Sequence, residues 1–338
     1  MAESFDPFQD ELQFPLGTNF ETLLLSLQDH VVHHLFSFFT VDTVLILSKV
    51  SHVVQEVCRS YTCEAWNIYG LSHEWFPDPI GFQAAMHVSN AVISGSLALQ
   101  YFNRERYPGC DMDVYLRVAG ADLLGRWFKG QGYRKSLDSE SYYICNSTTP
   151  AIRLIESSSV ENMCRLRNGI LEVRNYIKFL VRTDHTVRKM QVQMIIVDIE
   201  PIHHILFEYH STALMNFITS REAVCLFPRS TLVDRISYIA HSEGNSLLAP
   251  KGWVKKYSAR GYQVVGRRQH GHVPEPVYGK RFVTDELCWT VHFNLNVVKG
   301  RGIYRKLDLT VPFEVLHPDS GTVSGSAFLR VAEPLVWQ

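Results

Sequence analysis

The sequence predicts an α+β protein with an N-terminal helical module, a mixed sheet flanked by helices, and a β-rich C-terminal extension. Apolar residues recur at helical spacing between Leu23 and Trp66. Short apolar runs then alternate with helical patterns, which is typical of a sheet domain. Toward the C-terminus, strand-like runs are separated by turns rich in Gly, Pro and Asp. The predicted division is a mobile arm over 1–22, a helical module over 23–70, a mixed-sheet domain over 80–245, and an α/β extension over 246–338 packed on that domain.

Composition is typical of an ordinary folded protein, with 46% hydrophobic and 20% charged residues. The 338 residues favour two or three structural units. A formal net charge of −1 gives no global electrostatic reason to expect nucleic acid or a membrane as partner. The seven cysteines are scattered and include no C-x-x-C pair, so we expect free thiols in a reducing compartment.

The N-terminal residues lack the basic and apolar regions of a signal peptide. No apolar run approaches the roughly 20 residues that a membrane-spanning helix needs. We therefore expect a cytoplasmic or nuclear protein with no membrane partner.

The first helical region contains two apolar stripes separated by a turn. Thr40 and Asp42 stand between the stripes, where a turn and an N-cap are expected. The stripes consist of Val31, Leu35 and Phe38, and then of Val44, Leu47, Val50 and Val54.

This region resembles the F-box, a module of short packed helices. The matching positions are Leu27, Val31, Phe36-Ser37-Phe38-Phe39, Asp42, Val44, Leu45, Leu47-Ser48, Val50-Ser51 and Trp66. The family usually opens with Leu-Pro, whereas here Gln28 follows Leu27. The resemblance implies docking to the Skp-type adaptor of a cullin-RING ubiquitin ligase through exposed apolar side chains. The partner-binding candidates are Leu27, Val31, Leu35, Phe38 and Leu47. The alternative is a helical cap on the next domain, because so small a module needs further packing.

The stretch from Ala91 to Leu116 contains the main chemical motif. An apolar run leads into a Gly95-Ser96 turn and a predicted helix over 97–106, which Pro108-Gly109 ends. Asp111 and Asp113 then flank the first residue of a predicted strand over 112–118. Carboxylates two positions apart on a strand share a face and can hold a divalent metal together. The N–H groups that open the helix could bind a phosphate.

These motifs resemble the DNA polymerase beta-type nucleotidyltransferase superfamily, in which Gly-Ser precedes D-x-D by about one helix length. Here fourteen residues separate Ser96 from Asp111. The resemblance implies that Asp111 and Asp113 ligate Mg²⁺ as catalytic residues. It also implies that Gly95 and Ser96 hold a nucleoside triphosphate. Paired aspartates also occur as turn and cap residues, which is the alternative interpretation.

The superfamily adds a third carboxylate from a neighbouring strand, because two Mg²⁺ ions need several anionic oxygens. The corresponding predicted strand, 191–197, carries the neutral residues Gln191 and Gln193. Asp198 ends this strand with the opposite parity, so only a bulge would bring it to the site. Glu156 is a weaker candidate. We therefore expect an incomplete metal site.

Further elements follow from local patterns. The predicted helices cover 80–88, 122–129, a long segment from Pro201 through Phe217, 230–241 with Ser230 as its cap, and 251–257. The predicted strands are 91–94, 142–145, 152–155, 170–180, 287–293 and 328–331.

Two basic segments offer weaker candidate sites. The cluster of Lys251, Lys255 and Lys256, with Trp253 and Tyr257 interleaved, would suit single-stranded nucleic acid, or simply form an amphipathic surface helix. The run 267–272, with two arginines and two histidines, could contact phosphate or be a solvated loop.

Segments 209–218, 226–229 and 256–262 are similar to fungal proteins that join an F-box-like region to a nucleotidyltransferase-like fold. The resulting expectation is an interaction adaptor: an F-box-like substrate receptor with an unknown protein target and a degenerate nucleotidyltransferase-like domain. The alternative is a Mg²⁺-dependent nucleotidyltransferase that transfers a nucleotidyl group from a nucleoside triphosphate to a hydroxyl.

Overall fold

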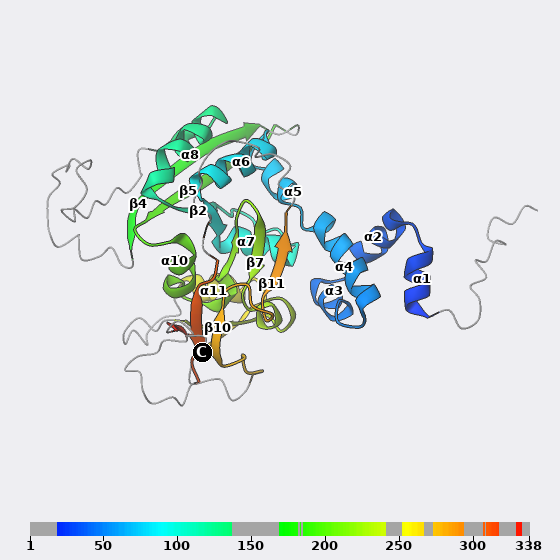
Figure 1. Ribbon diagram of the computed structural model, residues 1–338. Coiled ribbons are helices and arrows are strands. Elements are labelled where there is room, and N and C mark those ends of the chain that lie inside the picture. The colour runs from blue at the N-terminus through cyan, green and yellow to red at the C-terminus, as the bar shows by residue number, and fades with distance from the viewer. Residues whose placement is uncertain are drawn as a thin grey trace, which may run out of the picture. The chain divides into compact units, whose positions relative to one another are not determined.

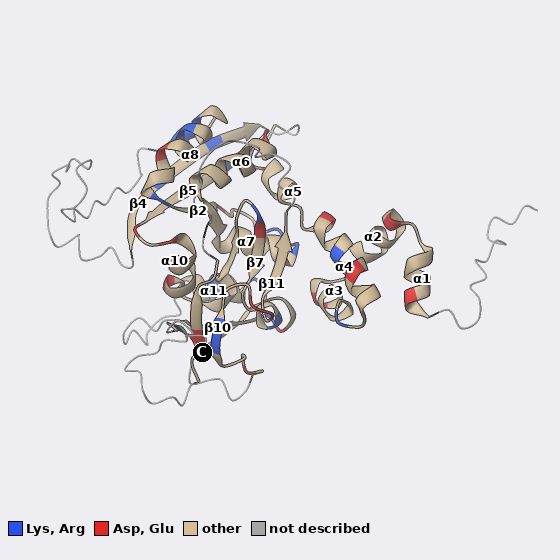
Figure 2. Cartoon of the chain, in the orientation of Figure 1, with Lys and Arg blue, Asp and Glu red and all other residues tan. Residues whose placement is uncertain are grey.

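A computed structural model shows an α+β protein whose chain divides into two compact units, Met1–Ala65 and Trp66–Gln338 (Figure 1). The structure describes residues 19–136, 169–181, 183, 185–240, 252–266, 273–293, 307, 309–317 and 329–332. Basic and acidic residues are interspersed along the elements of both units (Figure 2).

The described part of the first unit is helical. It contains α1 (Phe20–Ser26), α2 (Asp29–Ser37), α3 (Val41–Leu47) and α4 (His52–Ala65). The side chain of Asn19 caps α1 by accepting a 2.8 Å hydrogen bond from the Thr22 N–H. The predicted arm over 1–22 is therefore wrong for its last residues, which form this capped helix. Residues 1–18 lie outside the described part.

Helix α4 is the centre of this small unit, since α1, α2 and α3 all contact it. Phe36 of α2 lies 5.4 Å from the ring of Tyr61 on α4. The buried side chains are Leu24, Val32, Phe36, Val41, Val44, Val54, Cys58 and Tyr61. Burial of each large apolar side chain contributes about 1.5–3 kcal/mol. Because so few side chains are buried, this unit is only modestly stable.

The second unit is organised around an eight-stranded mixed sheet. Its strand order is β11-β7-β6-β1-β2-β5-β4-β3. Only β2 and β5 pair in parallel, and the other neighbours are antiparallel. The strands are β1 (Val92–Ser94), β2 (Met112–Arg117), β3 (Arg134–Lys135), β4 (Ile170–Val181), β5 (Val187–Val197), β6 (Asn216–Ile218), β7 (Glu222–Cys225) and β11 (Trp289–His292).

Helices pack against this sheet and fix its strands. Helix α8 (Val118–Gly130) contacts β2 and β5 and packs against α6 (Pro79–Ser89), which follows α5 (Ile68–His73). Helix α7 (Gly95–Asn103) contacts β1, β2 and β6, and α10 (Pro201–Glu208) contacts the same three strands. The central strands are consequently almost fully buried.

The predicted long helix from Pro201 through Phe217 is wrong beyond residue 208. Helix α10 ends at Glu208, a short 3-10 turn covers Thr212–Leu214, and β6 follows. Every residue from 211 to 220 is buried, so the apolar spacing there reflects burial on all sides and not one face of a helix.

The predicted helix over 230–241 is also wrong. A π-helical turn, η2, covers Arg229–Val233, and Arg235 then adopts a φ of 53° that ends any helix. Strand β8 (Ile236–Tyr238) follows and pairs in parallel with β9 (Gln263–Val265).

The C-terminal part contributes to more than one sheet. Strand β11 forms one edge of the main sheet by pairing with β7. The other elements are α11 (Gly252–Ser258) and a three-stranded sheet of β10 (Gly279–Phe282), β12 (Pro312–Val315) and β13 (Leu329–Val331). The predicted strands over 142–145 and 152–155, Glu156, and the basic run 267–272 lie outside the described residues. Within the described part, every helix is too short or too polar to cross a lipid bilayer.

Candidate functional site

A row of four polar side chains crosses the middle of the main sheet. Ser94 of β1 pairs with Asp113 of β2, and Asp113 pairs with Gln193 of β5. Gln193 in turn pairs with Asn175 of β4. Residues directly opposite each other on neighbouring strands share a face, so the Asp113 carboxylate lies between the hydroxyl of Ser94 and the amide of Gln193, and the amide of Asn175 follows.

Helix α7 begins against this row. Gly95, its first residue, has a φ of +71°, which favours glycine. A Cβ on Gly95 would lie 2.5 Å from Oδ2 of Asp113. The Gly-Ser turn and Asp113 are therefore in van der Waals contact, and position 95 has no room for a side chain.

Ser96, the predicted phosphate ligand, is already engaged by protein side chains. Its Oγ lies 2.9 Å from the Tyr257 hydroxyl of α11 and accepts a 3.1 Å hydrogen bond from Nη1 of Arg260. The guanidinium of Arg260 stacks over the ring of Tyr107 at 4.0 Å from the centroid. Ser96 is only 7% exposed as a result. These side chains cover the position at which a phosphate would meet the serine.

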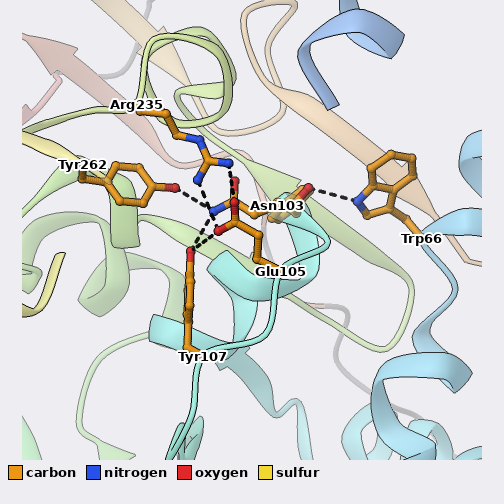
Figure 3. Close-up of polar contacts among 7 residues, drawn as sticks. Trp66, Asn103, Glu105, Tyr107, Arg235 and Tyr262 are labelled. Atoms are coloured by element: carbon orange, nitrogen blue, oxygen red, sulfur yellow. Dashed lines mark hydrogen bonds and ion pairs between the residues drawn. The ribbon is translucent and has the colours of Figure 1, made fainter. Parts of the chain in front are cut away.

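A polar network anchors the far end of α7 (Figure 3). Asn103 donates hydrogen bonds of 3.0 Å to the Tyr107 hydroxyl and 2.7 Å to the Tyr262 hydroxyl. Tyr107 donates to Glu105, which also accepts a 2.6 Å hydrogen bond from Arg235. The loop that leads from α7 to Asp111 is thus fixed to the segments around β8 and β9.

Burial raises the pKa of Asp113 to about 7, with the negative charge of Asp111 as the second cause, while the ammonium of Lys256 opposes the shift. Burial also raises the pKa of Asp111, against the nearby charges of Lys189 and Lys256. Burial and the charge of Asp111 therefore disfavour ionisation of Asp113, which is close to half protonated at neutral pH.

The third carboxylate expected in an active site of this type is missing from the described residues. Gln193 stands beside Asp113, in the position that a neighbouring strand would use. Asp198 does not join them, because it is exposed and lies beyond the pair Arg117 and Val197, five positions along β5 from Gln193. A rise of about 3.3 Å per residue places it roughly 16 Å along the strand. Parity also assigns it to the opposite face.

Among the described residues, no cluster of three Asp, Glu, His or Cys side chains could hold a metal ion. Two carboxylates with neutral amides beside them supply too little negative charge for a pair of Mg²⁺ ions. Within the described part of the chain, the donor set at Asp111 and Asp113 therefore does not fit a two-metal centre.

The predicted partner-binding residues differ in exposure. Val31, Leu35 and Phe38 are 40%, 37% and 74% exposed. Leu27 and Leu47 are half-buried. The residues Leu25, Ile46 and Val50 are more exposed than these two, although the F-box resemblance did not single them out as binding residues. Leu25 and Ile46 lie in α1 and α3, whereas Val50 lies in the turn between α3 and α4, where helical periodicity does not apply.

Sequence reasoning also missed the role of Tyr257 and Arg260. The segment 251–257 was predicted to be a basic, aromatic helix with a possible affinity for nucleic acid. In the structure Tyr257 is buried against Ser96. The contact spans 161 positions of sequence, so no local pattern signals it.

Comparison of the chain with protein-family models, with curated proteins and with solved structures found no match.

Proposed function

We propose that this protein is an F-box-like substrate receptor of a cullin-RING ubiquitin ligase. Its first unit would bind a Skp-type adaptor, and its second unit would recognise a protein target. In this proposal the second unit is a nucleotidyltransferase-like fold that has lost its chemistry.

The observation that carries the proposal is that α2 has two apolar faces. Val32 and Phe36 face the core of the unit and are at most 4% exposed. Val31, Leu35 and Phe38 recur at helical spacing on another face and are exposed to solvent. A helix that needed only to fold would keep the second face polar. A second apolar face with a large aromatic ring supports docking of a protein partner.

Two features of the second unit support a binding role over catalysis. Gln193 supplies no charge where a third carboxylate would stand. Tyr257 and Arg260 both form hydrogen bonds with the hydroxyl of Ser96. The neutral Gln193 would weaken binding of a metal ion, and the covered Ser96 would weaken binding of a triphosphate.

The experiment is a direct binding assay between the full chain and a Skp-type adaptor. We expect a stable complex, and we expect Leu35→Glu with Phe38→Glu to weaken it by at least about tenfold, since the exchange puts charge into an apolar contact. Val118→Glu is the matched control, because Val118 is 49% exposed and begins α8 in the other unit. Failure of the unchanged chain to bind the adaptor would remove the ligase role.

The second candidate is a Mg²⁺-dependent nucleotidyltransferase. The contact between Gly95 and the Asp113 carboxylate favours it, because it joins the Gly-Ser turn to the aspartate pair. Incubation with labelled nucleoside triphosphates and Mg²⁺ or Mn²⁺ tests it. Transfer that disappears with Asp111→Asn would sustain this candidate. If neither binding nor transfer of nucleotide is found, it is excluded.

A further inference from the structure

Strand β5 has an edge that extends beyond its neighbour β2. Pairing between β2 and β5 begins at Met112 and Val192, whereas β5 itself begins at Val187. On the opposite edge, residues 187–191 pair with β4 throughout. Among the described residues, no strand pairs with the β2-side edge of 187–191.

A cavity of about 760 Å³ lies along this edge. One side consists of residues 186–191, and the other of the 106–111 loop together with Glu74, Trp75, Leu97 and Gln100. In a strand paired on one side only, alternate residues direct their N–H and C=O groups toward the free side. The five residues span roughly 16 Å. This length suits a short extended peptide that adds to the sheet in line with β2.

The charges around the cavity favour an acidic ligand. Arg106 and Arg188 both pair with the carboxylate of Glu74, with the Arg188 contact at 3.7 Å. Their side chains are still 81% and 37% exposed, so each guanidinium retains donors for a ligand. Lys189 adds a third cation to the lining, against the carboxylates of Glu74 and Asp111.

We propose that this cavity binds an extended peptide segment of a target protein by strand addition to β5, with an acidic side chain of that segment against Arg106 and Arg188. The assignment rests on the proposed role as a substrate receptor and names the class of target feature recognised. A nucleic acid strand fits less well, because Glu74 and Asp111 would repel its phosphates. The peptide groups on the β2-side edge of 187–191, with which no strand of the described part pairs, also match a peptide backbone and not a sugar-phosphate chain.

The test begins with selection of a randomised peptide library, displayed on phage, against the full chain. The tightest peptide is then synthesised with a fluorescent label and its affinity measured by polarisation. We expect selected sequences to be enriched in Asp and Glu. Hydrogen exchange should show slowed exchange of backbone amides in 187–191 when the peptide is bound. Arg188→Glu should weaken binding by about tenfold or more.

Two further variants keep the test decisive. Arg106 lies on an exposed loop, so Arg106→Glu should weaken binding of the peptide without disturbing the sheet. Lys129→Glu is the matched control, because Lys129 is an exposed basic residue on α8 and does not line the cavity. Circular dichroism confirms that each variant folds.

Peptides without acidic enrichment, peptides whose affinity is unchanged by both arginine variants, or protection outside 187–191 would overturn the proposal. So would an empty selection, or a single-stranded oligonucleotide that binds this edge while no peptide does. The adaptor assay stays separate from these results. A chain that binds the peptide but not the adaptor would refute the ligase role alone. A chain that binds the adaptor but no peptide would refute the peptide site alone.

Discussion

Gly95 is the residue at which backbone conformation and close packing coincide. Alanine at this position would have to keep the left-handed backbone conformation. Its Cβ would also press against Oδ2 of Asp113. We expect Gly95→Ala to lower the free energy of unfolding by about 3 kcal/mol, from backbone strain plus overpacking. Urea denaturation of the full chain measures this change.

Gly109 is the matched control for that variant. It has a similar φ of +66°, but a Cβ there would meet nothing within 4 Å. Gly109→Ala should therefore cost about 1 kcal/mol, from backbone strain alone. Combining Gly95→Ala with Asp113→Ala should recover part of the loss, because the clashing oxygen is gone. Equal costs at both glycines would contradict the close approach of Gly95 to Asp113.

The raised pKa of Asp113 makes stability depend on pH. The folded pKa of about 7 lies above the value of about 3.9 for an unfolded aspartate, so the folded state binds more protons between these values. The stability contributed by protonated Asp113 is therefore fully present below about pH 4. It is lost as the pH rises from about 4 through 7. Asp113→Asn should raise the free energy of unfolding by about 2–4 kcal/mol at pH 8.5 and by little at pH 4.

Urea melts of the wild type and Asp113→Asn across this range measure the difference. A difference that stays constant with pH would refute the assignment. Addition of Mg²⁺ provides an independent check on the site. Under the adaptor proposal it leaves the melting of the wild type unchanged, whereas a resident divalent ion would stabilise the ionised aspartate pair.

At the scale of elements, two aromatic residues help to hold α11 in place: Trp253, which stacks on His210, and the buried Tyr257. Tyr257 is 3% exposed and contacts both Ser96 and the stacked Arg260. Tyr257→Phe should cost about 1 kcal/mol, because Ser96 keeps its hydrogen bond from Arg260. Tyr257→Ala should cost about 3–5 kcal/mol through the cavity it leaves. Urea denaturation separates the two, and a large loss from the phenylalanine variant would show that the hydroxyl matters more than packing.

The sequence predicted elements with clear local boundary signals, including the fully buried strand β1, but it did not predict strands β6 and β8. The helix predicted over 80–88 is confirmed as α6, where Asp78 accepts a hydrogen bond from Gly81 N–H and Pro79 opens the helix. The strand predicted over 112–118 is confirmed as β2, which contains Asp113, whereas Asp111 precedes it. Strands β6 and β8 are buried throughout, so neither presents an alternation of two residues. Their apolar residues were consequently misinterpreted as helical.

The candidate site divides in the same way. The spacing of Gly95 and Asp113 predicted that they would lie together, as the close approach of Asp113 to Gly95 shows, and parity predicted that Asp198 would lie apart from Gln193. The cover over Ser96 comes from residues more than 150 positions away in sequence. Such contacts depend on the assembled fold, and a local pattern contains no information about them.

For the whole molecule, the division into two units predicts two unfolding transitions. The first unit has a small core, so we expect it to melt at the lower temperature. Val54→Ala in α4 should lower only the first transition, and Val114→Ala in β2 only the second, each by several degrees for a loss of about 2 kcal/mol. Differential scanning calorimetry of the full chain measures both. A single transition shifted equally by either variant would indicate one cooperative unit.

Under the adaptor proposal, the polar row across the sheet also determines how readily the second unit could acquire two-metal chemistry. Gln193→Glu would place a carboxylate beside Asp113, which already resists ionisation. Without a cation between them, the new acid would destabilise the fold. Tyr257 and Arg260 would still cover Ser96. Under that proposal, a path toward a two-metal site that begins with Gln193→Glu passes through a less stable variant, which makes the path hard to follow by single steps in a directed selection.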